Sequence, residues 1–378
     1  MNSIDLDITT DDENIEALCK KYWELKDDES FLYTVKSLSK QYGFKSHIIR
    51  KLVQENSNAY SQSIFCRRCS TPYIYSSRTD LQTFHSTIWT CDVCMKDLQT
   101  IELEKLHAKK SLQKSLIESE YLLSTRQSMD LSSISLKHAV SLLSVIRLTA
   151  SENFQIILPI STAQKKLAPT SDYQYKILVD LYNEDLLYVH PHSNSEAFNF
   201  DVDNTKIESF YPLNISWALP IEEKITVEKL ETTFQNMEWE EGWDVEIKSI
   251  WKEIALNECL EYLLYIMKDH GFDFKPGDKT ILTINNILND FSVSQIFNFI
   301  WSAAKSAASY YMREKPPKQQ AANSVVGTLQ RNAERAKAEQ WDITHYKRDR
   351  RCPQTMISEV FFNAVLQIGD EGFNKPPQ

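Results

Sequence analysis

Four of the seven cysteines stand in two pairs whose spacing suits a metal ion. Cys66 and Cys69 form one Cys-x-x-Cys pair, and Cys91 and Cys94 form a second pair about twenty residues later. Two such pairs predict a structural Zn²⁺ site, because four thiolates complete a tetrahedral shell and leave no position open for water. We therefore expect this metal to build the fold and not to catalyse a reaction.

The other three cysteines, Cys19, Cys259 and Cys352, are scattered singly. Cys19 and Cys259 lie in apolar helical contexts, where we expect small buried side chains. An odd cysteine count in a chain of this length suggests a reducing compartment. The acidic N-terminus lacks the apolar run of a secretory signal, and no apolar run reaches the ~18 residues that a membrane helix needs. We expect a cytoplasmic protein without a membrane partner.

Basic side chains gather around the cysteine pairs although the chain carries a net charge of −10. From Lys36 to Asp80 the sequence has about eight Lys or Arg and two acids. An acidic protein needs such a local patch to bind nucleic acid. Solvated basic residues with no partner are the alternative. The candidate nucleic-acid contacts are Lys45, His47, Arg50, Lys51, Arg67, Arg68 and Arg78.

Two short helices precede the cysteine pairs, in the segment from Tyr33 to Asn56. Gly43 breaks the apolar period, and Ser46 can cap a second helix whose outward side chains are polar and basic. Helix, glycine-containing turn and basic second helix resemble a helix-turn-helix, and the resemblance implies contact with DNA. An ordinary helical hairpin with a solvated basic face is the alternative.

Residues 65–95 resemble a zinc ribbon. Between the cysteine pairs, aromatic and β-branched residues at 72–75 and 83–90 flank a polar turn, which predicts a β-hairpin. Zinc ribbons bind DNA, RNA or protein, so the resemblance implies a metal and a fold and leaves the partner open. Arg67 and Arg68 lie inside the first pair, where they can offset the charge of the thiolates or contact phosphate.

The middle of the chain resembles a winged helix. Expected helices at 161–167 and 171–187 precede a β-hairpin near 188–218. Such domains bind DNA or dock proteins. Asp180, Glu184 and Asp185 on the second helix, with three further acids in the hairpin, oppose phosphate contact and favour protein docking.

We predict a mainly α, multi-domain fold with a small β zinc ribbon, a winged-helix-like β-hairpin and a helical C-terminal bundle. The segments are a helix-turn-helix-like unit (1–60), the zinc ribbon (61–98), a connector helix (99–130), a winged-helix-like domain (131–222) and the bundle (223–378).

Catalytic patterns are weak in this sequence. It contains no phosphate-binding loop, no Gly-x-Ser-x-Gly and no His-Glu-x-x-His. Asp244, Glu246 and Lys248 could suggest a metal-dependent nuclease, but they open an expected helix, where acids favour the positive end of the dipole. We expect a non-enzyme with no catalytic residue and no small-molecule substrate.

The leading hypothesis is a non-catalytic, nucleic-acid-associated subunit of a larger assembly. Its N-terminal module would contact DNA or other nucleic acid, and the remainder would dock protein partners in a hetero-complex. By analogy alone, that assembly could be an ATPase or nuclease machine for chromosome maintenance or phage defence. The alternatives are a stand-alone DNA-binding transcription regulator and a zinc-braced protein scaffold that does not bind nucleic acid.

Overall fold

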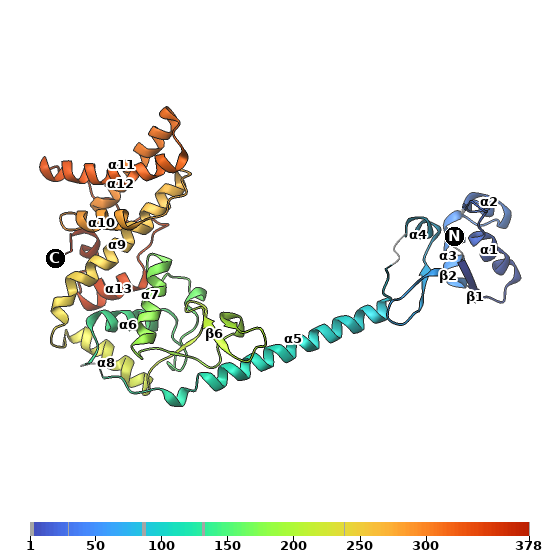
Figure 1. The fold of residues 1–378 in the computed structure, drawn as a ribbon, viewed down its shortest axis with the longest axis horizontal. Helices are drawn as coiled ribbons and strands as arrows, with labels where there is room; N and C mark the ends of the chain where they lie inside the picture. The colour runs from blue at the N-terminus through green and yellow to red at the C-terminus, as the bar shows by residue number, and fades with distance from the viewer. Residues whose placement is uncertain (1–3, 29, 85–87, 131–132, 238, 378) are drawn as a thin grey trace. The chain divides into compact units, whose positions relative to one another are not determined.

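The computed structural model describes residues 4–28, 30–84, 88–130, 133–237 and 239–377. The fold is mainly helical with small antiparallel sheets, as predicted (Figure 1). It divides into two compact units, the N-terminal unit (Met1–Lys109) and the C-terminal unit (Lys110–Gln378). Among the described helices, none is long and apolar enough to cross a membrane.

The N-terminal unit contains the segment of residues 33–56 and the four paired cysteines, and the unit boundary falls within α5. Its elements are β1 (Ile4–Ile8), α1 (Glu13–Trp23), α2 (Val35–Tyr42), α3 (Ser46–Asn56), β2 (Ser57–Phe65), β3 (Pro72–Tyr75), α4 (Arg78–Thr83) and α5 (Asp92–Glu120).

Helices α2 and α3 confirm the two helices predicted in this segment. The Thr34 hydroxyl accepts a hydrogen bond from the backbone N–H of Ser37 at 3.0 Å, which caps α2. Gly43 ends α2 with φ of 73°, a left-handed conformation that glycine adopts without steric cost. Ile49 and Val53 are buried on the inner face of α3. The chain passes from Asn56 directly into β2.

An antiparallel sheet in the order β1-β2-β3 closes the N-terminal unit. Ile4 pairs with Ser61, and Ala59 pairs with Tyr75. Neither β1 nor β2 was predicted, since serine, asparagine and glutamine interrupt the apolar pattern of β2. The core of this unit is formed by Leu18, Cys19, Tyr22, Trp23, Leu38, Ile49, Val53, Ala59, Tyr75 and Leu81.

The hairpin near the cysteines differs from the predicted one. The observed hairpin is formed by β2 and β3, with Phe65 opposite Pro72, so that the first cysteine pair lies in its turn. Helix α4 occupies 78–83, where the predicted hairpin would turn and its second strand would begin. The remainder of that predicted strand includes residues 85–87, outside the described residues. The predicted strand at 72–75 is therefore present as β3, but its hairpin partner is β2, which precedes the cysteines, and not the segment that follows α4.

The first half of the C-terminal unit begins within α5 and combines helices with two small sheets. Its further elements are α6 (Leu136–Thr149), α7 (Ser171–Asn183), β4 (Tyr188–Val189), β5 (Phe198–Phe200), β6 (Ile207–Phe210) and β7 (Trp217–Ala218). Strand β5 pairs with β6, and β4 pairs with β7. The helix predicted at 161–167 is wrong, because only a single 3-10 turn, Ile160–Thr162, forms there. The winged-helix resemblance stays a prediction.

The second half of this unit is helical, as predicted. Its elements are α8 (Glu223–Asn236), α9 (Trp243–Asp269), α10 (Asp278–Ile287), α11 (Val293–Glu314), α12 (Lys318–Ala338), α13 (Met356–Glu359), a π-helical turn (Val360–Val365) and α14 (Glu371–Asn374). Ser292 and Gln295 form a reciprocal capping box that starts α11. Helix α9 packs against α10 and α11, and α11 also packs against α12 (Figure 1).

The basic loop before α13 is tied into the C-terminal unit by its arginines. The Arg348 guanidinium donates to both carboxylate oxygens of Glu258, at 2.8 and 3.3 Å, and lies 4.3 Å from the Phe373 ring. The Glu258 side chain is only 3 % exposed and also accepts from the Ser358 hydroxyl. The Arg351 guanidinium lies 4.2 Å from the Tyr265 ring of α9. These contacts stabilise the bundle, because a buried carboxylate needs partners of this kind.

Candidate metal centre

The four paired cysteines come together from two places in the N-terminal unit. Cys66 and Cys69 lie in the turn of the β2–β3 hairpin. Cys91 and Cys94 lie at the start of α5, where the Met95 N–H donates to the Cys91 carbonyl at 2.8 Å. The unpaired N–H groups of a helix start favour negative charge, so this position suits thiolates.

The sulfur positions suit one ion. All four Sγ atoms lie within 4.8 Å of one another, and those of Cys69 and Cys91 are 3.6 Å apart. Sulfurs at ~2.3 Å from a tetrahedral ion stand roughly 3.8 Å apart. Among the described residues, no other group brings three or more Cys, His, Asp or Glu ligand atoms close enough together to bind one metal ion. The cluster can therefore bind a metal ion.

Backbone contacts bring the second pair to the first. The Arg67 N–H donates to the Trp89 carbonyl at 3.1 Å, and Cys66 forms a parallel bridge with Trp89. The Trp89 ring packs edge-on against Tyr73, which stacks on Phe84 with centroids 4.2 Å apart. This aromatic group, from β3 and the chain after it, fixes Trp89 and thereby places Cys91 beside the hairpin turn.

The surroundings of Cys66, Cys69 and Cys94 shift the pKa values of these thiols in different directions. Backbone N–H groups of Cys69 and Cys91 donate toward the Cys66 sulfur and lower the pKa of that thiol to about 6. The Thr71 hydroxyl, 3.0 Å from the Cys69 sulfur, lowers the pKa of Cys69. Burial raises the pKa of Cys94 to about 12, and the neighbouring sulfurs add to that increase. Four close thiols cannot all be anions without a cation among them, so the arrangement suits a bound metal.

The turn that holds the first pair contains a left-handed residue. Ser70, directly after Cys69, has φ of 60°, and its N–H donates to the Cys66 carbonyl at 2.9 Å. A residue with a Cβ atom is strained in this conformation, whereas glycine is not. The sequence pattern gives no signal for this strain. Thr71 and Trp89 also contact the cysteine pairs. Neither residue was predicted, because no sequence motif marks such contacts.

Helix α3 presents several of the predicted nucleic-acid contacts. His47, Arg50 and Lys51 are exposed on the face opposite Ile49 and Val53. Lys51 lies 3.7 Å from Glu55, but both side chains are more than half exposed, so this pair is weak. This face of α3 is therefore exposed to solvent.

Lys45 and the two arginines of the hairpin turn are also exposed. Lys45 is the residue before α3. Arg67 and Arg68 stand between the first two cysteines, and Arg68 lies 3.8 Å from Asp97 of α5. The structure thus places exposed basic side chains at α3 and at the hairpin turn.

Arg78 has a different role from the predicted one. Its guanidinium donates to the backbone carbonyls of Tyr33, at 2.6 Å, and of Tyr22. It lies 4.1 Å from the Tyr22 ring and 4.3 Å from the Phe31 ring. Burial lowers the pKa of Arg78 to about 10. The prediction of a phosphate contact is corrected, because this side chain is occupied in holding α1 and the following loop to α4.

Two polar side chains of the C-terminal unit, Glu246 and Ser294, are of types that take part in catalysis. Glu246 lies on α9 and accepts hydrogen bonds from the N–H groups of Leu136 and Lys137, so it caps α6. Ser294 and His345 lie 2.7 Å apart, but Ser294 is fully buried at the start of α11. A nucleophile must reach its substrate, and this hydroxyl does not.

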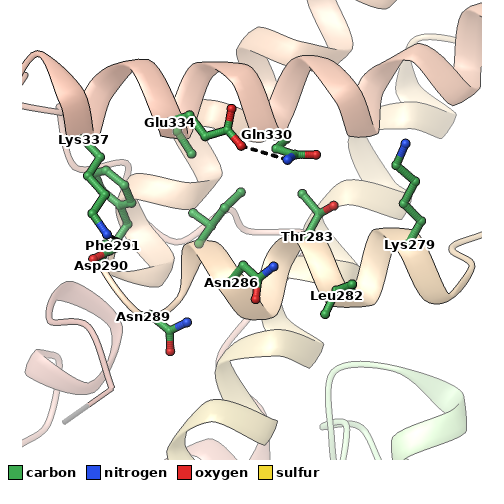
Figure 2. A pocket seen from close by; sticks show the side chains of 12 residues that line it. Lys279, Leu282, Thr283, Asn286, Asn289, Asp290, Phe291, Gln330, Glu334 and Lys337 are labelled. Atoms are coloured by element: carbon green, nitrogen blue, oxygen red, sulfur yellow. Dashed lines mark hydrogen bonds and ion pairs between the residues drawn. The ribbon is translucent and has the colours of Figure 1, made fainter.

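A groove of about 470 Å³ lies between α10 and α12 (Figure 2). Lys337 and Asp290 pair across one end at 2.8 Å, and Gln330 donates to Glu334 at 2.8 Å. The side chains that line it include no Ser, Cys or His. Figure 2 shows both charge signs and amides along its walls, without a convergent nucleophile and base.

Comparisons with models of protein families, with curated proteins and with solved structures found no match to this chain.

Proposed function

We propose that the chain is a zinc-containing, non-catalytic subunit of a larger assembly and that its N-terminal unit binds DNA. One observation carries the proposal: helix α3 exposes His47, Arg50 and Lys51 and leads directly into the hairpin whose turn holds the first cysteine pair. The pair α2–α3 resembles a helix-turn-helix. Helix-turn-helix proteins place the second helix in the major groove.

Zinc is the metal that suits this centre best. Four sulfur donors at tetrahedral distances favour Zn²⁺ over the hard cations Mg²⁺ and Ca²⁺, which prefer oxygen. The ion would hold the hairpin turn, with Arg67 and Arg68, against the start of α5. In this role the metal positions the basic residues and does not contact nucleic acid itself.

The basic residues at α3 and in the hairpin turn support phosphate contact. Arg50, Lys51 and Arg67 carry long cationic side chains, and each of them is exposed. Contacts of this kind release counterions, so affinity should fall steeply with salt, by a slope of about 0.9 for each phosphate neutralised.

The C-terminal unit is the proposed protein-docking part. Glu184 and Asp185 are exposed at the end of α7 and oppose contact with phosphate. An assembly subunit should copurify with a partner at fixed stoichiometry. A stand-alone regulator should instead prefer one DNA sequence and act without a partner.

Fluorescence anisotropy of the full chain with a labelled DNA duplex, at 50 to 200 mM salt, tests the proposal. We expect Arg50→Glu and Arg67→Glu to weaken binding about tenfold or more and to reduce the salt slope. The matched control is Lys224→Glu, since Lys224 is an exposed lysine of α8 in the C-terminal unit.

Binding that is absent, or that does not change with salt, would overturn the DNA part of the proposal and favour the scaffold. Equal weakening by Lys224→Glu would show that the effect follows net charge and not the surface of α3. Preference for one DNA sequence, without a partner, would favour the regulator.

A further inference from the structure

Helix α5 leaves large apolar side chains in solvent. Leu98, Ile101 and Leu112 are 45 %, 37 % and 52 % exposed, Ala108 is also exposed, and Leu116 is partly exposed. At 100° per residue these five lie within an arc of about 80°. We call them the α5 stripe. An exposed apolar stripe of this length on one helix is typical of an interface.

Within the C-terminal unit, the last turns of α5 pack through a face other than the α5 stripe. Lys110 pairs with Glu196 at 3.1 Å, and Gln113 donates to Asn204 at 2.7 Å. Ile117 is fully buried. The helical angles of Lys110, Gln113 and Ile117 place them roughly 100° or more from the middle of the stripe. A partner could therefore cover the stripe without displacing these contacts.

The charges of α5 are divided along its length. Residues 97–104 contain three acids, Asp97, Glu102 and Glu104, and no base. Residues 105–114 contain four lysines and no acid. Two parallel copies of this helix would place like charges side by side, whereas two antiparallel copies would place the acidic segment of each beside the basic segment of the other.

We propose that α5 pairs antiparallel with α5 of a second copy of this chain, centred near Lys105. In this register Leu98 of one copy lies beside Leu112 of the other, and Glu102 lies near Lys109. Lys105 falls within the stripe, where its methylenes can cover apolar neighbours while its ammonium reaches the acids of the second copy. The inference does not depend on DNA binding.

The helix is long enough for this role. From Leu98 to Leu116 it rises roughly 27 Å, which is between two and three heptads. Isolated helices are marginal in water without packing of an apolar face, so α5 gains stability from a partner along the stripe.

Sedimentation equilibrium of the full chain tests the proposal. The wild-type chain should form dimers that weaken as salt is raised. Glu102→Lys with Glu104→Lys, and separately Lys105→Glu with Lys109→Glu, should each raise the dimer Kd at least about tenfold, because each variant opposes like charges. An equimolar mixture of the two variants should form dimers again, since their charges complement each other.

A matched pair of substitutions tests the apolar contact. Leu98→Gln should weaken the dimer, whereas Leu103→Gln should not, because Leu103 is 57 % exposed but lies on the opposite face of the helix. Circular dichroism should show unchanged helix content in every variant. A wild-type chain that stays monomeric at ~100 µM, a level that detects micromolar Kd values, overturns the proposal. The proposal is also overturned if the equimolar mixture of the two charge variants forms no more dimer than either variant alone.

Discussion

At the scale of single residues, Arg78 joins three parts of the N-terminal unit. Its guanidinium contacts Tyr22 of α1, and Phe31 and Tyr33 of the following loop, while its own backbone starts α4. Truncation would remove charge-assisted hydrogen bonds from two backbone carbonyls. The residue therefore matters for stability and not for ligand contact.

We predict that Arg78→Ala lowers the free energy of unfolding of the N-terminal unit by about 2 kcal/mol, the usual range for hydrogen bonds to a charged group. Arg78→Lys should recover only part of this loss, because an ammonium lacks the planar fork. Urea unfolding, monitored by circular dichroism, measures the free energy of unfolding of each variant. Arg67→Ala, at an exposed site, is the control and should change stability little; equal losses would contradict the role of Arg78.

Substitution of Ser70 by glycine should increase stability, in contrast to the loss expected for Arg78→Ala. The φ of 60° at Ser70 is left-handed. Ser70→Gly should stabilise the hairpin turn by roughly 0.5–1 kcal/mol, because glycine relieves the strain of the left-handed backbone, and Ser70→Val should destabilise it, because a β-branched side chain increases that strain. Retention of metal against a competing chelator is the measurement. Faster metal loss from the glycine variant than from wild type would count against this explanation.

Spacing in the sequence was sufficient to predict the cysteine cluster, because thiolate pairs on tight turns have few other uses. Arg78 could not be distinguished in this way from Arg67 or Arg68. All three are arginines near the cysteines, and only the packing of α1 and α4 around Arg78 removes it from the surface.

At the scale of elements, the β2–β3 hairpin and the start of α5 depend on each other through the cysteines. Each contributes one pair, and backbone contacts at Trp89 hold the two segments together. A metal bound by these sulfurs would order both segments at once.

We predict about one zinc ion per chain by elemental analysis. Removal of the metal with a chelator, or Cys66→Ser, should increase amide hydrogen exchange in residues 62–76 and 89–97. Helices α9 to α12 should keep their protection and serve as the internal control. Cys352→Ser should not lower the metal content, as that thiol lies in the C-terminal unit. Unchanged exchange in the metal-free chain would show that the cluster does not need an ion.

Helices were easier to predict than strands in this chain. The capping box at Ser292 and the proline after Lys315 set the bounds of α11 correctly, since both are local signals. Strand β2 has a mixed polar sequence and is stabilised by pairing with β1, far away in the chain. Such long-range pairing leaves little local trace, which is why the hairpin was placed on the wrong side of Cys66.

At the scale of the whole molecule, the chain has two separate cores. The smaller core belongs to the N-terminal unit, and the larger core extends from the end of α5 through the bundle. Separate cores of this kind usually unfold separately.

We therefore predict two transitions in differential scanning calorimetry. A chelator should lower the midpoint of the transition of the N-terminal unit and leave the other within about 1 °C, because only one unit contains the cysteine cluster. Arg348→Met should lower the midpoint of the C-terminal unit's transition and leave that of the N-terminal unit unchanged, because it breaks the buried pair with Glu258. A single transition that shifts with both treatments would contradict two independent units.

The position of the two cysteine pairs has a consequence for chain entropy. A metal that joins Cys69 to Cys91 closes a loop in the unfolded chain much as a cross-link does, and such closure is worth roughly 3 kcal/mol for a loop of this size. The cost of closure grows only with the logarithm of loop length, by about 0.6 kcal/mol for each doubling. The stretch between α4 and Trp89 can therefore gain residues at small cost, whereas a single residue added between Cys66 and Cys69 would displace a sulfur from the cluster.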